Sequence, residues 1–462
     1  MDRYGVHVRR FATRFRGCDP TESNPKEVTI SSAHLTADGF EDSPDNVHQG
    51  HQPQDRHDEP TLIEQPVGGI PPIVDTQAQL EHVAEKLRAG TGPVAVDTER
   101  ASGYRYGQRA FLIQLKRQGD TIWLLDPEAL ESLAPIQQAL NGVEWILHAA
   151  IQDLPSLRQA GLWPDRLFDT ELAGRLLGYH KVSLSALLEH KLNITLAKEH
   201  SAADWSVRPL PEDMRNYAAL DVELLHELRD VIILELQAAH KLEIAYEEFN
   251  SLLTRPHKPP RKDPWRRTSG IHEITDRRTL AIVKSLWTTR EKIARSRDLP
   301  PGKLLNDRSL VAVAKSKPRT VPQLMKIPRM RRKAASRDAR RWLQAVQDGI
   351  KVAQDPDKVP PMRASSQSPP AVKAWRDKEP LAARRLQTCR NRLARVADQQ
   401  NMPLENLLLP ETLREICWRP PEPITPESVE RRLSDLGARP WQIQATSAVI
   451  TVALLDPDPL EK

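Results

Sequence analysis

The stretch VAVDTERASG, residues 94–103, runs three apolar residues directly into Asp97, with Glu99 two positions later. Residues two apart on a β-strand point to the same face, so the two carboxylates would lie side by side. At about 4 Å and an effective dielectric constant near 20, two such charges repel each other by roughly 4 kcal/mol. A strand that ends in this way therefore needs a cation to offset the repulsion.

A divalent metal ion is the natural candidate for that cation, because carboxylate oxygens suit Mg²⁺ and Mn²⁺. Arg100 is adjacent to the pair, but strand alternation would point it to the opposite face. A chain with 62 Asp and Glu also contains such pairs by chance, at the exposed ends of surface strands. The pair alone therefore does not establish a metal site.

Apolar periodicity around this stretch predicts a mixed α/β sheet, because strands come first and strands alternating with helices follow. We expect strands at 94–99, 110–117, 121–127 and 144–150, and helices at 75–90, near 131–140, from Asp153, and over most of 171–250. The remainder of the chain has helical periodicity only. Two similar stretches, 293–305 and 393–408, indicate duplicated helical modules.

The predicted organisation has three folded parts. We expect a disordered segment at 1–70, an α/β domain at 71–252, a basic linker at 253–275, a helical domain at 276–354, a linker at 355–372 and a second helical domain at 373–456. The first segment is polar and lacks periodicity, which favours disorder. Both linkers are rich in proline, which interrupts helices.

Charge is distributed unevenly along the 462 residues. Residues 255–355 hold 27 Lys and Arg against 9 Asp and Glu, whereas residues 91–254 hold 15 against 24. A basic region beside an acidic one favours binding of a polyanion such as a nucleic acid, and a solvated basic surface is the alternative. Three cysteines with wide spacing argue against a zinc site or a disulfide framework. The sequence contains no apolar run of about 18 residues, so it predicts no membrane span. We expect a cytoplasmic protein.

Two later segments supply further acidic residues. WILHAAIQDLPSL, residues 145–157, puts Asp153 at the start of a helix, where it could also act only as an N-cap. NYAALDVELL, residues 216–225, puts Tyr217 and Asp221 four apart on one helix face, where a simple Tyr–Asp hydrogen bond is the alternative.

VDTE, LHAAIQDL and YAALD together resemble the three motifs of DEDD-superfamily 3′–5′ exonucleases that carry tyrosine in the third motif. Across residues 75–250 the chain most resembles the ribonuclease D family, and residues 287–318 resemble an HRDC domain. The resemblance implies a ribonuclease H-like mixed-sheet exonuclease domain followed by all-α HRDC-type domains. Arg100 is a departure, since the family often has an aromatic residue there, so local substrate contacts could differ.

The resemblance also implies the chemistry. It implies a metal-dependent 3′–5′ exoribonuclease that trims structured RNA precursors such as tRNA and releases nucleoside 5′-monophosphates by a two-metal mechanism. The implied ligands of two Mg²⁺ ions, which Mn²⁺ could replace, are Asp97, Glu99, Asp153 and Asp221. Tyr217 completes the catalytic set. Because its intrinsic pKa is near 10, we expect it to orient the attacking water rather than to act as a base.

Substrate contacts are harder to assign from sequence. The candidates are Tyr104, Tyr106, His148 and Arg208. Packing is the stronger interpretation for His148, and Trp205 is interpreted as a core residue with base stacking as the alternative. We expect a monomer that binds RNA, in particular tRNA precursors with 3′ extensions. A DNA 3′–5′ exonuclease and a non-catalytic nucleic-acid-binding protein on a nuclease fold remain alternatives.

Overall fold

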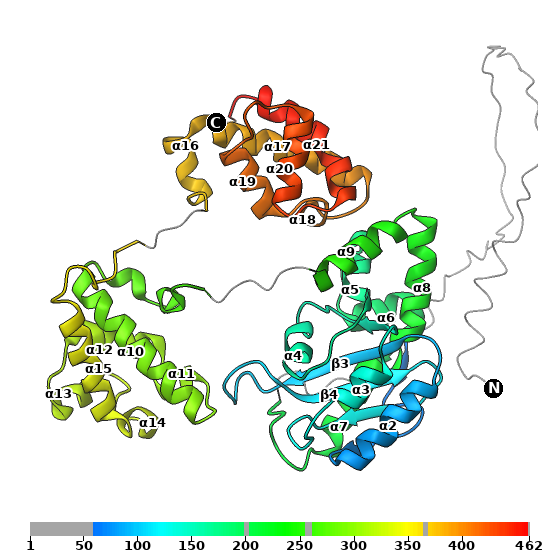
Figure 1. Cartoon of the computed structure of the whole chain (residues 1–462), viewed down its shortest axis with the longest axis horizontal. Coiled ribbons are helices and arrows are strands. Elements are labelled where there is room, and N and C mark those ends of the chain that lie inside the picture. Colours follow the sequence, from blue (N-terminus) through cyan, green and yellow to red (C-terminus); the bar gives the residue numbers. More distant parts are fainter. Residues whose placement is uncertain (1–58, 198–202, 255–260, 364–367, 461–462) are drawn as a thin grey trace, which may run out of the picture. The chain divides into compact units, whose positions relative to one another are not determined.

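The computed structural model describes residues 59–197, 203–254, 261–363 and 368–460 (Figure 1). Of the segment predicted to be disordered, 1–70, residues 1–58 lie outside this range. Within the described residues no helix combines the length and the apolar character that a membrane span requires.

A six-stranded mixed sheet forms the centre of the first domain, as the sequence predicted. Its strands, in spatial order, are β2 (Ile73–Val74), β5 (Ile122–Leu125), β4 (Ala110–Arg117), β3 (Val94–Arg100), β6 (Glu144–Leu147) and β7 (Arg166–Asp169). Pairing is antiparallel for β3 with β4 and for β4 with β5, and parallel for β2 with β5, β3 with β6 and β6 with β7.

Strand β3 is an interior strand, with β4 on one side and β6 on the other. Its apolar run Val94–Val96 is completely buried, whereas Asp97 and Glu99 are partly exposed. In the register of the antiparallel pair Asp97 lies opposite Gln114 of β4. The strand therefore anchors the acidic pair at the centre of the sheet.

Helices cover this sheet and complete the domain. They are α2 (Gln77–Ala89), α3 (Ala134–Ala139), α4 (Leu154–Gln159), α5 (Thr170–Leu176), α6 (Leu184–Leu192), α7 (Glu212–Glu223), α8 (Leu225–Ala238) and α9 (Leu242–Thr254). Helix α7 packs across β3, β4 and β5, while α8 packs on β6 and α9 on β7. Helix α2 begins at a capping box of Thr76 and Gln79, which satisfies amides at its first turn.

A second, two-stranded sheet corrects the predicted start of the folded chain. Strand β1 (Thr61–Ile63) pairs in parallel with β8 (Ile194–Leu196). Residues 61–63, which we predicted as part of a disordered segment, are thus ordered by a partner more than 130 residues away in the sequence. Local composition carries no signal of such a long-range pairing.

The next domain is all-helical, as predicted. It contains α10 (Arg277–Ser296), α11 (Pro301–Leu304), α12 (Asp307–Ser316), α13 (Val321–Met325), α14 (Lys333–Ser336) and α15 (Ala339–Val352), preceded by the short 3₁₀ turns η1 (Pro264–Arg267) and η2 (Ile271–Glu273). Helices α10 and α15 pack against each other around the buried Trp342. Their close approach requires Gly349, because a Cβ there would lie 2.6 Å from the Cα of Ile282.

The last domain is also all-helical. It contains the turn η3 (Val372–Ala374) and the helices α16 (Trp375–Lys378), α17 (Pro380–Gln399), α18 (Leu404–Leu407), α19 (Pro410–Trp418), α20 (Pro426–Asp435) and α21 (Pro440–Leu455). Helices α17, α20 and α21 surround a core that includes Leu393, Leu433 and Ile450. Both similar sequence stretches cover the end of a 20-residue helix, α10 or α17, and the short helix after it.

Candidate active site

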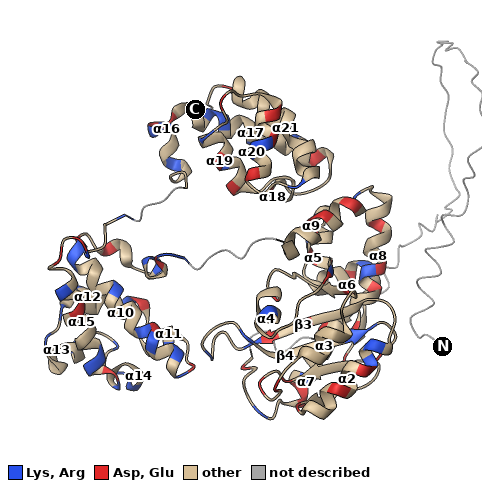
Figure 2. Ribbon diagram, in the orientation of Figure 1, with Lys and Arg blue, Asp and Glu red and all other residues tan. Residues whose placement is uncertain are grey.

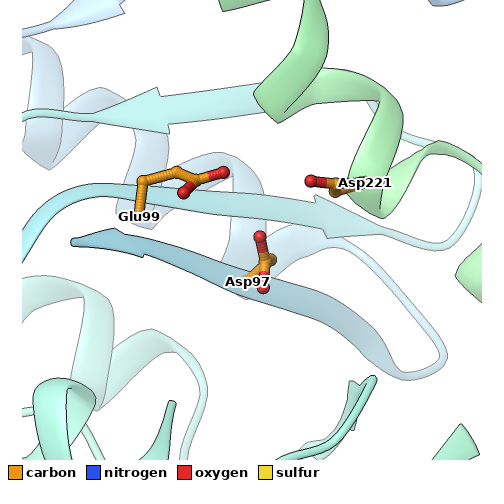
Figure 3. Close-up of side chains that lie close together, drawn as sticks. All are labelled: Asp97, Glu99 and Asp221. Atoms are coloured by element: carbon orange, nitrogen blue, oxygen red, sulfur yellow. The ribbon is translucent and has the colours of Figure 1, made fainter. Parts of the chain in front are cut away.

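Three of the predicted carboxylates converge on one face of the sheet. One oxygen each of Asp97, Glu99 and Asp221 lies within 4.8 Å of the other two (Figure 3). Strand alternation places the first two on the same face of β3, and α7 brings Asp221 over them. Because hard oxygen ligands in this number suit a divalent cation, the cluster is a candidate metal site.

The electrostatics of the cluster are unfavourable without a cation. Burial, and then the charges of Asp153, Asp221 and Glu99, raise the pKa of Asp97 well above its usual value. Burial, and then Asp221 and Asp153, raise the pKa of Glu99 in the same way, while Arg100 opposes the shift. A bound divalent cation would relieve this repulsion.

Gln114 is a second indication that the face is built to hold a ligand. Its side chain lies on the same face as that of Asp97, because directly opposed residues of two paired strands share a face. The residue is fully buried, and neither polar atom of its amide has a hydrogen-bond partner among the described residues. Such orphaned groups are rare in folded proteins and call for an explanation, for example an ion or a bound water.

Asp153 does not join the three converging oxygens. It precedes α4, but its side chain makes no N-cap hydrogen bond, so the N-cap interpretation is wrong. Its Oδ1 instead accepts hydrogen bonds from Thr98 Oγ1 at 2.8 Å and from Arg100 Nη1 at 2.9 Å. Burial raises the pKa of Asp153, and these two neighbours oppose that rise.

Tyr217 lies one turn before Asp221 on α7, and both residues line a small cavity of about 140 Å³. Burial, and then the charges of Asp221, Glu99 and Asp97, raise the pKa of Tyr217 above its usual value. Without a bound cation the phenol is therefore protonated at neutral pH. Its ring lies 6.2 Å from that of Trp205, which is only 1% exposed, as predicted for a core residue.

Two of the candidate substrate contacts are engaged in structural hydrogen bonds. His148 Nδ1 lies 2.9 Å from Thr170 Oγ1, and burial lowers the pKa of His148 to about 4, which favours the packing interpretation. Arg208 Nη2 donates to Asp126 Oδ1 at 2.8 Å and to the carbonyl oxygen of Phe111 at 2.7 Å. Its guanidinium thus ties a loop to the sheet.

Tyr104 and Tyr106 lie in the loop between β3 and β4, and Tyr104 is 36% exposed. Their assignment as substrate contacts stays a prediction.

Three family models match consecutive parts of the chain. A model described as "3'-5' exonuclease" matches residues 71–237, the HRDC domain matches 279–346, and a model described as "3' to 5' exonuclease C-terminal domain" matches 368–454. Ribonuclease D of Jannaschia sp. (strain CCS1) is 30% identical over 329 residues, which are 68% of this chain and 80% of that protein. The chain belongs to the ribonuclease D family. The family, together with the nuclease model, makes the protein a 3′–5′ exoribonuclease.

Solved structures agree with this fold. A protein from Bifidobacterium adolescentis is 38% identical, with a TM-score of 0.78, covering 86% of this chain and all of that one. Escherichia coli RNase D is 24% identical, with a TM-score of 0.60 over 79% of this chain and 98% of that chain, and shows the same fold. This chain and both of those proteins therefore share one fold.

Sequence reasoning missed one supporting residue of this ribonuclease D fold. Asp169 is 2% exposed and caps α5 by accepting from the amides of Glu171 and Leu172. The same carboxylate accepts from the amides of Ala149 and Ala150, which hold the turn before Asp153, where Ala149 has a φ of 60°. An Asp between a strand and a helix is a typical N-cap signal, so the cap could have been found from sequence but its link to the turn could not.

Proposed function

We propose that this exoribonuclease trims the 3′ ends of structured RNA precursors, tRNA above all, and releases nucleoside 5′-monophosphates by a two-metal mechanism. The observation that carries the proposal is the convergence of Asp97, Glu99 and Asp221 within 4.8 Å. Such a group of carboxylates has no evident structural use, because each member raises the energy of the others.

Mg²⁺ is the proposed cofactor, with Mn²⁺ as a substitute, since both prefer oxygen ligands. Asp97, Glu99 and Asp221 would hold the cations, and Asp153 would contribute a fourth carboxylate. With four acidic groups the charge of about −4 balances two divalent ions. When bound, such a pair of ions activates the attacking water and stabilises the leaving 3′ oxygen.

Tyr217 is proposed to orient the attacking water. Its phenol hydrogen-bonds Asp221, which lies one helical turn away, and the lone pairs of its oxygen can accept a hydrogen bond from a water. Both residues line the same cavity, so a water held there would contact the phenol and the carboxylate together. Because the intrinsic pKa of a tyrosine phenol is near 10, proton removal from that water is not assigned to Tyr217.

RNA binding is assigned to the HRDC domain, where Lys and Arg residues recur along the helices (Figure 2). Residues 326–341, which we call the basic segment, contain eight Lys and Arg and one Asp. That one acid, Asp338, is buried and paired with Arg297 at 2.6 Å, so it neutralises little of the exposed charge. The basic segment therefore suits the phosphate backbone, and binding through it should weaken steeply with salt.

The test is digestion of a 3′-extended tRNA precursor by the full-length protein, with Mg²⁺ or with EDTA. We expect mononucleotide release that depends on Mg²⁺, loss of cleavage in Asp97→Asn, and RNA binding by that variant close to the unsubstituted level. Trimming by Asp97→Asn at the normal rate would refute the site. Faster digestion of a matched single-stranded DNA would show a DNA exonuclease instead, and RNA binding without any release of mononucleotides would show a binding protein.

The compartment and the assembly state belong to the same proposal. We propose that the enzyme acts in the cytoplasm, because Cys389 and Cys417 are free thiols, which suits a reducing compartment. We also propose that it is a monomer. Sedimentation of the purified protein at several concentrations tests the assembly state.

A further inference from the structure

Arg100 ends β3 immediately after the acidic pair and makes contacts that the proposed mechanism does not use. Its Nη1 donates a hydrogen bond to Asp153 Oδ1 at 2.9 Å and another to the carbonyl oxygen of Gln152. The side chain of Arg100 is 21% exposed and that of Asp153 is 6% exposed, so the pair is largely withdrawn from water. Charge-assisted hydrogen bonds in such surroundings are among the stronger ones in proteins.

A second donor holds the same carboxylate oxygen. Thr98 Oγ1 donates to Asp153 Oδ1 at 2.8 Å and lies 3.1 Å from Ser156 Oγ. Ser156 in turn donates to the main-chain oxygen of Asp153 at 2.8 Å. Thr98 points to the face of β3 opposite Asp97 and Glu99. Thr98 and Arg100 thus hold the fourth carboxylate outside the group of three oxygens that converge.

The electrostatic influence of this ion pair reaches the cluster. The charge of Asp153 raises the pKa values of Asp97 and Glu99, and the charge of Arg100 lowers that of Glu99. The guanidinium therefore offsets part of the negative charge that a metal ion would offset. Two cationic groups that compensate the same carboxylates compete with each other.

We propose that Arg100 is a positioning residue that competes with a divalent cation for Asp153. The inference rests on the proposed function, because it takes the acidic residues to be metal ligands. Asp97, Glu99 and Asp221 already converge and would bind the first cation. A cation that needs Asp153 binds more weakly, because the guanidinium and the Thr98 hydroxyl must first release the carboxylate. Arg100 thereby sets the cation concentration at which the site fills.

The test is a titration of the full-length protein with Mn²⁺ in the absence of RNA, with free Mn²⁺ measured by electron paramagnetic resonance. In the unsubstituted protein we expect one stronger and one weaker class of site. Arg100→Gln removes the charge and should tighten the weaker class by about tenfold, the ratio expected for loss of one charge-assisted hydrogen bond. Arg100→Lys keeps the charge and should stay near the unsubstituted affinity.

Arg158→Gln is the matched control. It removes an exposed arginine of α4 that stacks on Trp163, with 3.6 Å from Cζ to the ring centroid, and should leave both affinities unchanged. In an Asp153→Asn background the effect of Arg100→Gln should vanish, because the contested carboxylate is gone. Thr98→Val removes only the second donor and should tighten the weaker class by less, which provides a second test if Arg100→Gln does not fold.

The outcomes separate this inference from the proposed function. If the unsubstituted protein takes up no Mn²⁺, or if Asp97→Asn takes up as much, the metal site itself fails. If uptake depends on Asp97 but Arg100→Gln leaves the affinities unchanged or weakens them, the site stands and the competition is refuted. Weakened binding in particular would mean that Arg100 orients Asp153 for the metal rather than competing for it.

Discussion

Removing one carboxylate from the acidic cluster should stabilise the metal-free protein. At 4.8 Å, the limit within which the oxygens of Asp97, Glu99 and Asp221 lie, and an effective dielectric constant near 20, each fully ionised pair repels by roughly 3.5 kcal/mol. Asp97→Asn removes two of the three pairs. Raised pKa values mean that proton uptake already relieves part of this repulsion, so we expect a net gain of about 2 kcal/mol.

Calorimetric unfolding of the full-length protein in EDTA measures this gain. For a domain of this size, about 2 kcal/mol corresponds to a rise of roughly 4–8 °C in the Tm of the exonuclease-domain transition. With Mg²⁺ at about 100 times its Kd, the unsubstituted protein should gain about 2.7 kcal/mol, and Asp97→Asn should lose most of that gain. The advantage that Asp97→Asn has in EDTA should therefore largely disappear in Mg²⁺.

Asp75→Asn is the control, since it removes an exposed carboxylate outside the cluster and should leave both melting temperatures nearly unchanged. A lower Tm for Asp97→Asn than for the unsubstituted protein in EDTA would show that the carboxylates do not repel as argued. Equal stabilisation of both proteins by Mg²⁺ would show that the cation binds elsewhere.

Three further predictions test other parts of the molecule. Changing Arg331, Arg332 and Lys333 of the basic segment to Gln should weaken RNA binding and reduce the slope of log affinity against log salt by about 2. Cleavage at saturating RNA should be retained. An unchanged slope would show that the RNA binds elsewhere. Burial lowers the pKa of His226 to about 4, against about 6.5 in the unfolded chain. The unfolding free energy should therefore fall by up to about 3 kcal/mol between pH 7 and pH 4. Urea unfolding of His226→Gln should show a flatter pH dependence. Gln114→Leu should leave folding intact but reduce cleavage and Mn²⁺ uptake, whereas equal uptake would assign its amide to packing alone.

The sequence was sufficient where local geometry decides the outcome. Strand alternation correctly placed Asp97 and Glu99 on one face, and helical spacing correctly placed Tyr217 one turn from Asp221. The mixed sheet and the helical domains after it were also predictable, because their periodicities differ over long stretches.

Contacts between distant segments were not predictable in this way. Asp153 looked like a helix cap, but Thr98 and Arg100, more than 50 residues earlier, hold its carboxylate instead. Arg208 stays a predicted substrate contact, and its pairing with Asp126 was not foreseen, because that pairing depends on how a loop folds back on the sheet. A single sequence carries no local signal of either partnership.

Asp169 affects how genetic variation in this enzyme should be interpreted. One buried carboxylate caps α5 and also holds the turn before Asp153, so almost any replacement disturbs both. A saturation mutagenesis screen scored by RNA trimming would rank position 169 beside the proposed metal ligands, although Asp169 is not among them. Intolerance to substitution there would report an architectural constraint, and a map of essential residues would overstate the extent of the catalytic surface.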